Sequence, residues 1–172
     1  MAPREDENNR PAAPRPNSLE TNREFQQQYT ACLEKLEHCL ETPFVPGELE
    51  RWFEQTQQAM QDVAKLLPRQ LDETHAQQLQ EIESEDPGLE HRVEEIRRVD
   101  GELRERFAQF HKRVDQLAKG AGNVEPDEAR MKEACYELVD EGLALVIAAR
   151  KQEVALRTWL LEAFDRDRGV VD

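Results

Sequence analysis

The hydrophobic positions of this chain recur at spacings of three and four residues over long stretches. The clearest stretch, residues 89–117, repeats at Leu89, Val93, Ile96, Asp100, Leu103, Phe107, Phe110, Val114 and Leu117. This spacing is typical of an amphipathic helix that buries one face. One position of that face, Asp100, carries a carboxylate, which is costly to bury unless another group pairs with it. The pattern therefore predicts a long helix with a single polar position in its buried face.

Two segments before this stretch show the same period. A first helix is expected to begin near Asn17 or Ser18, which are good N-caps, and to end before the proline-containing stretch 42–47. Its inward positions are Gln26, Tyr29, Leu33, Leu36 and Leu40. A second helix is expected from about Pro46 to Ser84, with a kink at Pro68 because proline lacks the backbone N–H that a helix needs.

The rest of the pattern completes a bundle. Asp86 is a candidate N-cap for the third helix, with Pro87 in its first turn, and a fourth helix is expected after Asp127. Its inward positions are Met131, Cys135, Leu138, Gly142, Leu145, Ala149, Gln152, Leu156, Trp159 and Ala163. Four helices with short connections predict an all-α, up-down-up-down four-helix bundle over residues 18–172. Residues 1–17 lack periodicity and are expected to form a disordered tail.

Composition narrows the functional classes. The net charge of −14 argues against nucleic acid and anionic membranes as partners, because both require a basic surface. No apolar run approaches the roughly 20 residues of a membrane span, and the N-terminus lacks a secretory h-region. The three cysteines do not form a disulfide framework, so a cytoplasmic protein is expected. Neither a phosphate-cradling loop nor a Ser/His or Cys/His arrangement for nucleophilic catalysis is recognisable.

Each predicted helix carries a polar residue at or near its buried face. These residues are Gln26, Arg69, Glu73, Asp100 and Gln152. Bundles that hold two iron or manganese ions are built in this way, from carboxylates and histidines that project inward from several helices. The pattern therefore predicts a polar site in the core of the bundle.

Two stretches resemble the hemerythrin-like family of the bacterial HHE cation-binding type. Residues 81–89 followed by 96–103 resemble that family's turn and its entry into the third helix, and residues 152–169 resemble its C-terminal ending. The resemblance covers about residues 18–172, and it implies a four-helix bundle with a histidine- and carboxylate-lined metal site. The family's ligand positions fall on Gln26 (or Gln27), Arg69, Glu73, Asp100, Gln152 and Leu156.

No histidine occupies any of those positions, and only one glutamate remains at its place. Glutamine is a poor iron ligand, and arginine and leucine are not ligands. The resemblance therefore implies a member that has lost the di-iron site, with no metal, no cofactor and no enzymatic activity. What remains is a vestigial polar network, in which Arg69 would pair with both Asp100 and Glu73.

Other arrangements of the same residues stay open. Arg69 and Glu73 can instead face solvent beside Pro68, which would leave Asp100 hydrated. His75, between Leu71 and Leu79, can face inward and form a weak mononuclear site with Glu73 and Asp100. The remaining histidines are expected to be solvated, and the three cysteines to be buried thiols; these residues are His38, His91, His111, Cys32, Cys39 and Cys135.

The expected function is a non-enzymatic scaffold, partner-binding or sensing module. The alternative is a metal-binding protein of the iron/oxygen hemerythrin-like kind with rearranged ligands. A third possibility is an ordinary bundle whose spacing matches the family by chance. A protein partner is possible, but neither its nature nor the oligomeric state follows from the sequence.

Overall fold

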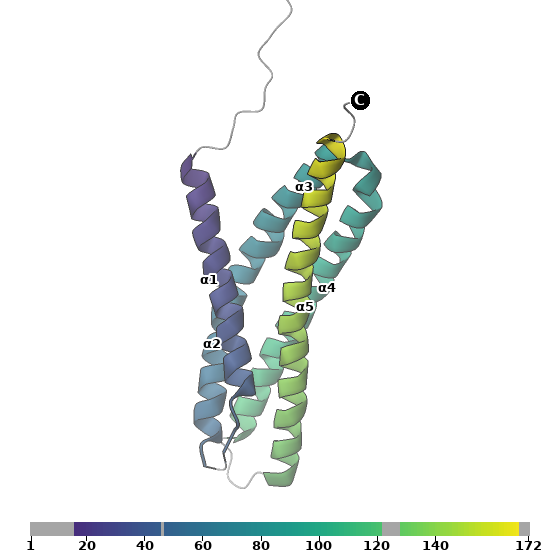
Figure 1. Cartoon of the computed structure of the whole chain (residues 1–172). Helices are drawn as coiled ribbons and strands as arrows, with labels where there is room; N and C mark the ends of the chain where they lie inside the picture. Colours follow the sequence, from purple (N-terminus) through teal and green to yellow (C-terminus); the bar gives the residue numbers. More distant parts are fainter. Residues whose placement is uncertain (1–15, 46, 122–127, 169–172) are drawn as a thin grey trace, which may run out of the picture.

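The computed structural model describes residues 16–45, 47–121 and 128–168, and over these ranges the chain is helical, with no strand. Four long helical rods lie side by side and form an elongated molecule (Figure 1). In chain order the elements are α1 (Pro16–Glu41), α2 (Leu49–Arg69), the π-helix η1 (Gln70–His75), α3 (Ala76–Glu85), the 3₁₀ turn η2 (Pro87–Leu89), α4 (Glu90–Ala121) and α5 (Glu128–Arg168). The predicted all-α bundle is therefore confirmed at this level, whereas the expected tail falls almost wholly outside the described residues.

Local chemistry explains where the helices begin and end. The Asp86 carboxylate accepts a hydrogen bond of 2.9 Å from the Gly88 backbone N–H, and Pro87 occupies the first position of the turn that leads into α4. This cap is the one predicted from the sequence. The second helix begins at Leu49, three residues later than predicted, after a loop in which Gly47 adopts a φ of 89°, a conformation that glycine reaches without strain.

The second rod changes its helix type just after Pro68. The sequence predicts a kink there, and the structure contains a π-helical segment, Gln70–His75, between α2 and α3. A π-segment widens the helix by joining residues five apart, and it often arises where the regular α-helical bonding is disturbed. The rod therefore continues from α2 through η1 into α3 without a break.

The apolar core is divided into two clusters. The larger cluster joins α1, α2, α4 and α5 and includes Tyr29, Phe53, Phe107 and Leu145. The smaller cluster is built only from α3, η2, α4 and α5 among the described side chains; its buried members are Leu79, Ile82, Leu89, Val93, Ile96, Leu156 and Ala163. In Figure 1 the N-terminal part of α1 diverges from α5, on the same side as the smaller cluster.

Close packing in the larger cluster depends on one glycine. A methyl group at Gly142 of α5 would lie 2.6 Å from both Leu40 Cδ1 and Phe110 Cζ, which is closer than atoms can approach. Glycine weakens a helix interior by roughly 0.5–1 kcal/mol relative to alanine. Glycine at position 142 therefore lowers the helix propensity of α5 but allows α1, α4 and α5 to pack closely.

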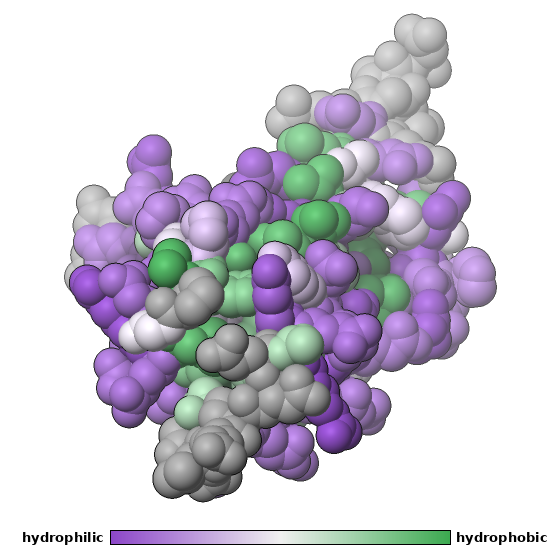
Figure 2. Space-filling model, turned by 90° about the horizontal axis from the view of Figure 1, so that it is seen from below, coloured by the Kyte–Doolittle hydropathy of each residue, from purple (hydrophilic) through white to green (hydrophobic). Residues whose placement is uncertain are grey.

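Charged side chains cover most of the outer surface. Viewed from below, hydrophobic residues form a band across the molecule with hydrophilic residues on both sides (Figure 2). Ion pairs link neighbouring helices, such as Arg150 with Glu37 at 2.6 Å and Arg113 with Glu141 at 2.7 Å. In the described part of the chain, every helix is too short or too polar to cross a membrane.

Candidate functional site

A layer of buried polar side chains separates the two apolar clusters. It consists of Gln26 from α1, Gln70 and His75 from η1, Asp100 from α4 and Gln152 from α5. Four of these residues are buried, with exposed fractions of 1% for Gln70, 2% for His75, and 7% each for Asp100 and Gln152. Gln26 is half-buried at the edge. We refer to these five residues as the polar layer.

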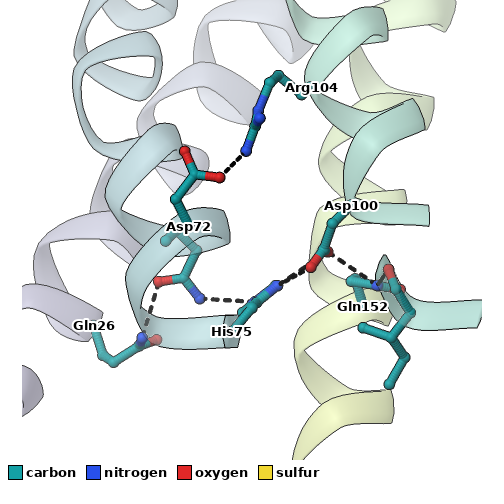
Figure 3. Close-up of polar contacts among 8 residues, drawn as sticks. Gln26, Asp72, His75, Asp100, Arg104 and Gln152 are labelled. Carbon is teal, nitrogen blue, oxygen red and sulfur yellow. Dashed lines mark hydrogen bonds and ion pairs between the residues drawn. The ribbon is translucent and has the colours of Figure 1, made fainter. Parts of the chain in front are cut away.

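The polar layer is one continuous chain of hydrogen bonds across the bundle. Gln26 Nε2 donates to Gln70 Oε1 at 2.9 Å, and Gln70 Nε2 lies 3.1 Å from His75 Nε2. His75 Nδ1 lies 3.0 Å from both carboxylate oxygens of Asp100. From the other side, Gln152 Nε2 donates to Asp100 Oδ1 at 3.0 Å (Figure 3). This series of hydrogen bonds therefore connects all four helical rods.

The direction of these hydrogen bonds indicates which ring nitrogen of His75 carries the hydrogen. Because Gln70 Oε1 accepts from Gln26, the amide nitrogen of Gln70 faces the imidazole and must donate to it. His75 Nε2 is then the acceptor and Nδ1–H is the donor to Asp100, which is the neutral form of the ring. A buried carboxylate that accepts from both an imidazole and an amide is compensated without a formal positive charge.

The polar layer is also hydrogen-bonded to the backbone of α4. Gln152 Nε2 also donates to the backbone carbonyl of Ile96 at 3.0 Å, which joins α5 to α4 one turn before Asp100. Outside the layer, Arg104 of α4 forms an ion pair with Asp72 of η1 (Figure 3). The π-helical segment and α4 are therefore joined twice, once in the interior and once at the surface.

Three of the five residues predicted for the core network belong to the polar layer, namely Gln26, Asp100 and Gln152. The other two, Arg69 and Glu73, do not. Their side chains are 43% and 71% exposed, and they pair with each other at 3.4 Å on the surface. The Arg69 guanidinium also lies 4.2 Å from the centre of the Phe25 ring. The predicted pairing of Arg69 with Asp100 is therefore wrong, as is a core position for Glu73.

The reason lies in the position of the inner face around Pro68. Steps of three and four residues from the buried Leu67 lead to Gln70, Leu71, Thr74 and His75, which are all buried. The pattern and the resemblance both placed Arg69 and Glu73 near this face, but each lies two residues after a buried leucine, Leu67 or Leu71, and therefore points away from the core. The contact between Gln70 and His75 had no signal in the sequence, because residues five apart do not face each other on an α-helix and meet only on a π-helix.

The other predicted positions are distributed as follows. Gln27 is exposed, so Gln26 is the inward glutamine of α1, and Leu156 belongs to the smaller apolar cluster. His38 and His91 are exposed as predicted, whereas His111 is half-buried.

All three cysteines are free thiols, but only Cys135 is fully buried, and Cys32 and Cys39 are half-buried. Burial raises the pKa of the Cys135 thiol to about 11. That shift keeps Cys135 protonated and inert at neutral pH.

A second carboxylate lies close to the layer. Oε1 of Glu153, the residue after Gln152, is buried without a hydrogen-bond partner among the described residues. Burial raises the pKa of Glu153, and the positive charges of Arg157 and Arg150 only partly oppose this effect. The pKa of Tyr29 is also raised, mainly by burial and further by the charges of Glu153 and Asp100. The region beside His75 is therefore acidic and poorly solvated.

The side chains of the polar layer do not fit the di-iron centre that the resemblance to the hemerythrin-like family implies. Such a centre requires several histidines and carboxylates that converge on the metals. In the described parts of the chain, no group of three or more His, Cys, Asp or Glu side chains is arranged to hold a metal ion. The one imidazole and one carboxylate of the layer are bonded to each other, and the remaining members are side-chain amides.

Comparisons with known proteins do not add a family to this description. No protein-family model, no curated protein and no solved structure matches the chain. The function is therefore inferred from the residues and geometry of the polar layer and of the surface around it.

Proposed function

We propose that this chain is a hemerythrin-like, up-down-up-down bundle that acts as a metal-free, non-enzymatic module for scaffolding, partner binding or sensing. One observation supports this proposal above the others: both ring nitrogens of His75 and both carboxylate oxygens of Asp100 are engaged by side chains of the chain itself. A metal ion bound by His75 would have to displace the Gln70 amide from Nε2 or the proton from Nδ1, because an imidazole ligand must offer a free lone pair.

The polar layer suits a structural role. It lies between the two apolar clusters and bonds side chains from every rod, so a shift of one helix along another would leave buried donors or acceptors unpaired. Buried polar groups at one level of a bundle are known to fix helix register, even where they add little net stability. The layer would then keep the helices in a single arrangement and hold the outer surface in a fixed shape.

Metal content is the measurement that tests the proposal. The full chain is produced in medium supplemented with iron, manganese and zinc, and bound metals are counted by elemental analysis. We expect well under one metal per chain, and a melting temperature that does not change when Fe²⁺ is added to the purified protein. About two metals per chain together with a near-ultraviolet oxo–iron band would refute the proposal.

A metal-binding protein with rearranged ligands is the second candidate. The observation in its favour is the buried, unpartnered Oε1 of Glu153, which lies near His75. A single divalent ion held by Glu153, His75 and Asp100 would need His75 to turn away from Asp100. In the same elemental analysis, this candidate requires one metal per wild-type chain and its loss in Glu153→Gln.

A cytoplasmic location is part of the proposal. Free thiols are typical of proteins in reducing compartments, and Cys32, Cys39 and Cys135 are all unpaired. The net charge of −14 favours partners other than nucleic acid or anionic lipid.

A further inference from the structure

The last helix carries a second apolar stripe on its outer side. Five large hydrophobic residues of α5 are strongly exposed, at 54% for Tyr136, 48% for Ile147, 65% for Val154, 60% for Leu161 and 42% for Phe164. Elsewhere in the described chain, Val45 is the only large hydrophobic residue exposed to this degree. Scattered apolar residues need no explanation on a protein surface, but their concentration on one helix does.

The spacing of these residues is that of a helix–helix contact. Ile147, Val154 and Leu161 are seven residues apart, as are Tyr136 and the half-buried Leu143, and Phe164 follows Leu161 by three. A repeat of seven residues with steps of three and four keeps one face of a helix against a partner helix. At roughly 1.5 Å per residue, this face is about 40 Å long. We call these six residues the outer stripe.

The inner face of α5 is already occupied. Leu138, Leu145 and Ala149 pack in the larger cluster, and Leu156 and Ala163 pack in the smaller one. Two members of the outer stripe also contact the bundle, since Leu143 packs against the larger cluster and the Tyr136 ring lies 5.1 Å from that of Phe44, whereas the others are additional to the face that folds the bundle. Its C-terminal part lies at the level of the smaller cluster, to which no described side chain of α1 contributes.

The charge around the outer stripe indicates the kind of partner. In the central segment 147–161 the charged residues are Arg150, Lys151, Glu153 and Arg157, so three of the four are basic, whereas the ends of the stripe carry acids, Glu137, Asp140 and Glu141 on one side and Glu162 on the other. The single acid of the central segment, Glu153, has one buried carboxylate oxygen and does not face outward like the bases. Arg150 pairs with Glu37 of α1, whereas Lys151 and Arg157 are exposed and lack a salt bridge to any described side chain.

The surface is hollowed at the centre of the stripe. Ile147, Arg150, Lys151 and Val154 line an open depression of roughly 280 Å³ whose exposed lining is mainly apolar. An apolar side chain from an opposing helix can enter such a depression while acidic side chains beside it reach the surrounding bases. A second copy of this chain would instead place two sets of these bases opposite each other, which is unfavourable.

We propose that the central part of the outer stripe of α5, from Ile147 to Leu161, docks an amphipathic helix of a partner protein, whose apolar face is flanked by acidic side chains. This inference rests on the proposed role as a partner-binding module and names the partner's chemistry. Apolar burial along the stripe supplies the attraction, and Lys151 and Arg157 select for the acidic flanks.

The test uses two synthetic helical peptides that share one heptad apolar face. One peptide has glutamate and the other has lysine at every flanking position, and binding of each labelled peptide to the full chain is followed by fluorescence anisotropy. We expect the acidic peptide to bind at least tenfold more tightly than the basic one, with weaker binding in 0.5 M salt. Equal binding of both peptides, or binding of neither, would overturn the proposal.

Three variants locate the interaction. Val154→Glu and Leu161→Glu should each weaken binding of the acidic peptide at least tenfold. Gln109→Glu on the exposed side of α4 adds the same charge and should leave the affinity for the peptide unchanged. The double variant Lys151→Glu/Arg157→Glu should reverse the preference toward the basic peptide. Circular dichroism and melting curves confirm that each variant is folded, since all of these side chains are exposed.

Sedimentation of the chain alone completes the experiment. We expect a monomer at micromolar concentration. A dimer that dissociates in Val154→Glu would show that a second copy covers the stripe, and it would overturn the proposed partner. Failure of the peptide experiments refutes this docking surface only, because the metal content tests the proposed function independently.

Discussion

Replacing His75 by leucine tests the polar layer most directly. Leucine is close to histidine in size, so the change removes hydrogen bonds and leaves only a small cavity. Asp100 would keep the amide of Gln152 but lose the imidazole N–H, and Gln70 Nε2 would lose its acceptor. Both partners are almost fully buried, at 1% and 7% exposure for Gln70 and Asp100, so water cannot replace the lost bonds without rearrangement.

The magnitude follows from these two losses. A hydrogen bond to a charged group contributes about 1.5–3 kcal/mol, and an orphaned buried amide donor costs about 1–3 kcal/mol. We therefore expect His75→Leu to lower the free energy of unfolding by about 3–5 kcal/mol, in line with the cost of breaking a buried polar pair. The measurement is urea denaturation at pH 7, followed by circular dichroism at 222 nm.

Arg69→Met is the matched control on the same rod. Its exposed ion pair with Glu73 and its contact with Phe25 together contribute about 1 kcal/mol or less. If Arg69 were the partner of Asp100, as the sequence suggested, this variant would be the costly one. A loss of about 3 kcal/mol in Arg69→Met, or less than about 1 kcal/mol in His75→Leu, would refute the arrangement described here.

A double-mutant cycle isolates the pair itself. His75→Leu/Asp100→Leu removes the carboxylate together with its donor, so no buried charge is left without compensation. We expect the double variant to be more stable than the sum of the single effects, by about 1–3 kcal/mol. Strict additivity would mean that His75 and Asp100 do not interact in solution.

Three further predictions concern single positions in the helices. Gly142→Ala should destabilise the protein by about 1–2 kcal/mol, because overpacking outweighs the gain in helix propensity. Gly101→Ala is the control, since Gly101 lies on the exposed side of α4 and nothing lies within 4 Å of the added methyl group; it should stabilise the protein by about 0.5–1 kcal/mol. Thermal unfolding of both variants checks the pair, and equal effects would contradict the close packing at Gly142. Because the pKa of Glu153 is raised in the folded state, its contribution to stability is full below the unfolded-state pKa and is lost as pH rises through the folded-state pKa. Glu153→Gln should therefore raise the melting temperature more at pH 7.5 than at pH 4. An equal gain at both pH values would contradict the raised pKa. The Cys135 thiol, with a pKa of about 11 and no exposed surface, should react with a thiol reagent at pH 8 only as fast as the protein unfolds, and rapid labelling of Cys135 located by mass spectrometry would contradict its burial.

The helices and most of their buried faces could be predicted from the amino-acid sequence. Repeats of three and four residues located the faces of α1, α4 and α5, because residues at this spacing share one side of an α-helix wherever that helix is regular. The same repeats placed Gln26, Asp100 and Gln152 inside the bundle, and the cap at Asp86 followed from local hydrogen bonding.

The partners of Asp100 could not be predicted from the sequence and became known from the three-dimensional arrangement of the helices. Periodicity ranks the positions of one helix but does not show which side chain of another rod stands opposite, and the sequence pattern and the resemblance both led to Arg69 and Glu73. The π-helical segment after Pro68 brings Gln70 and His75 to the same side, although they are five residues apart. Asp100 is therefore bonded to an imidazole and an amide and not to an arginine, because His75 lies on the inner face of this rod whereas Arg69 lies at its surface.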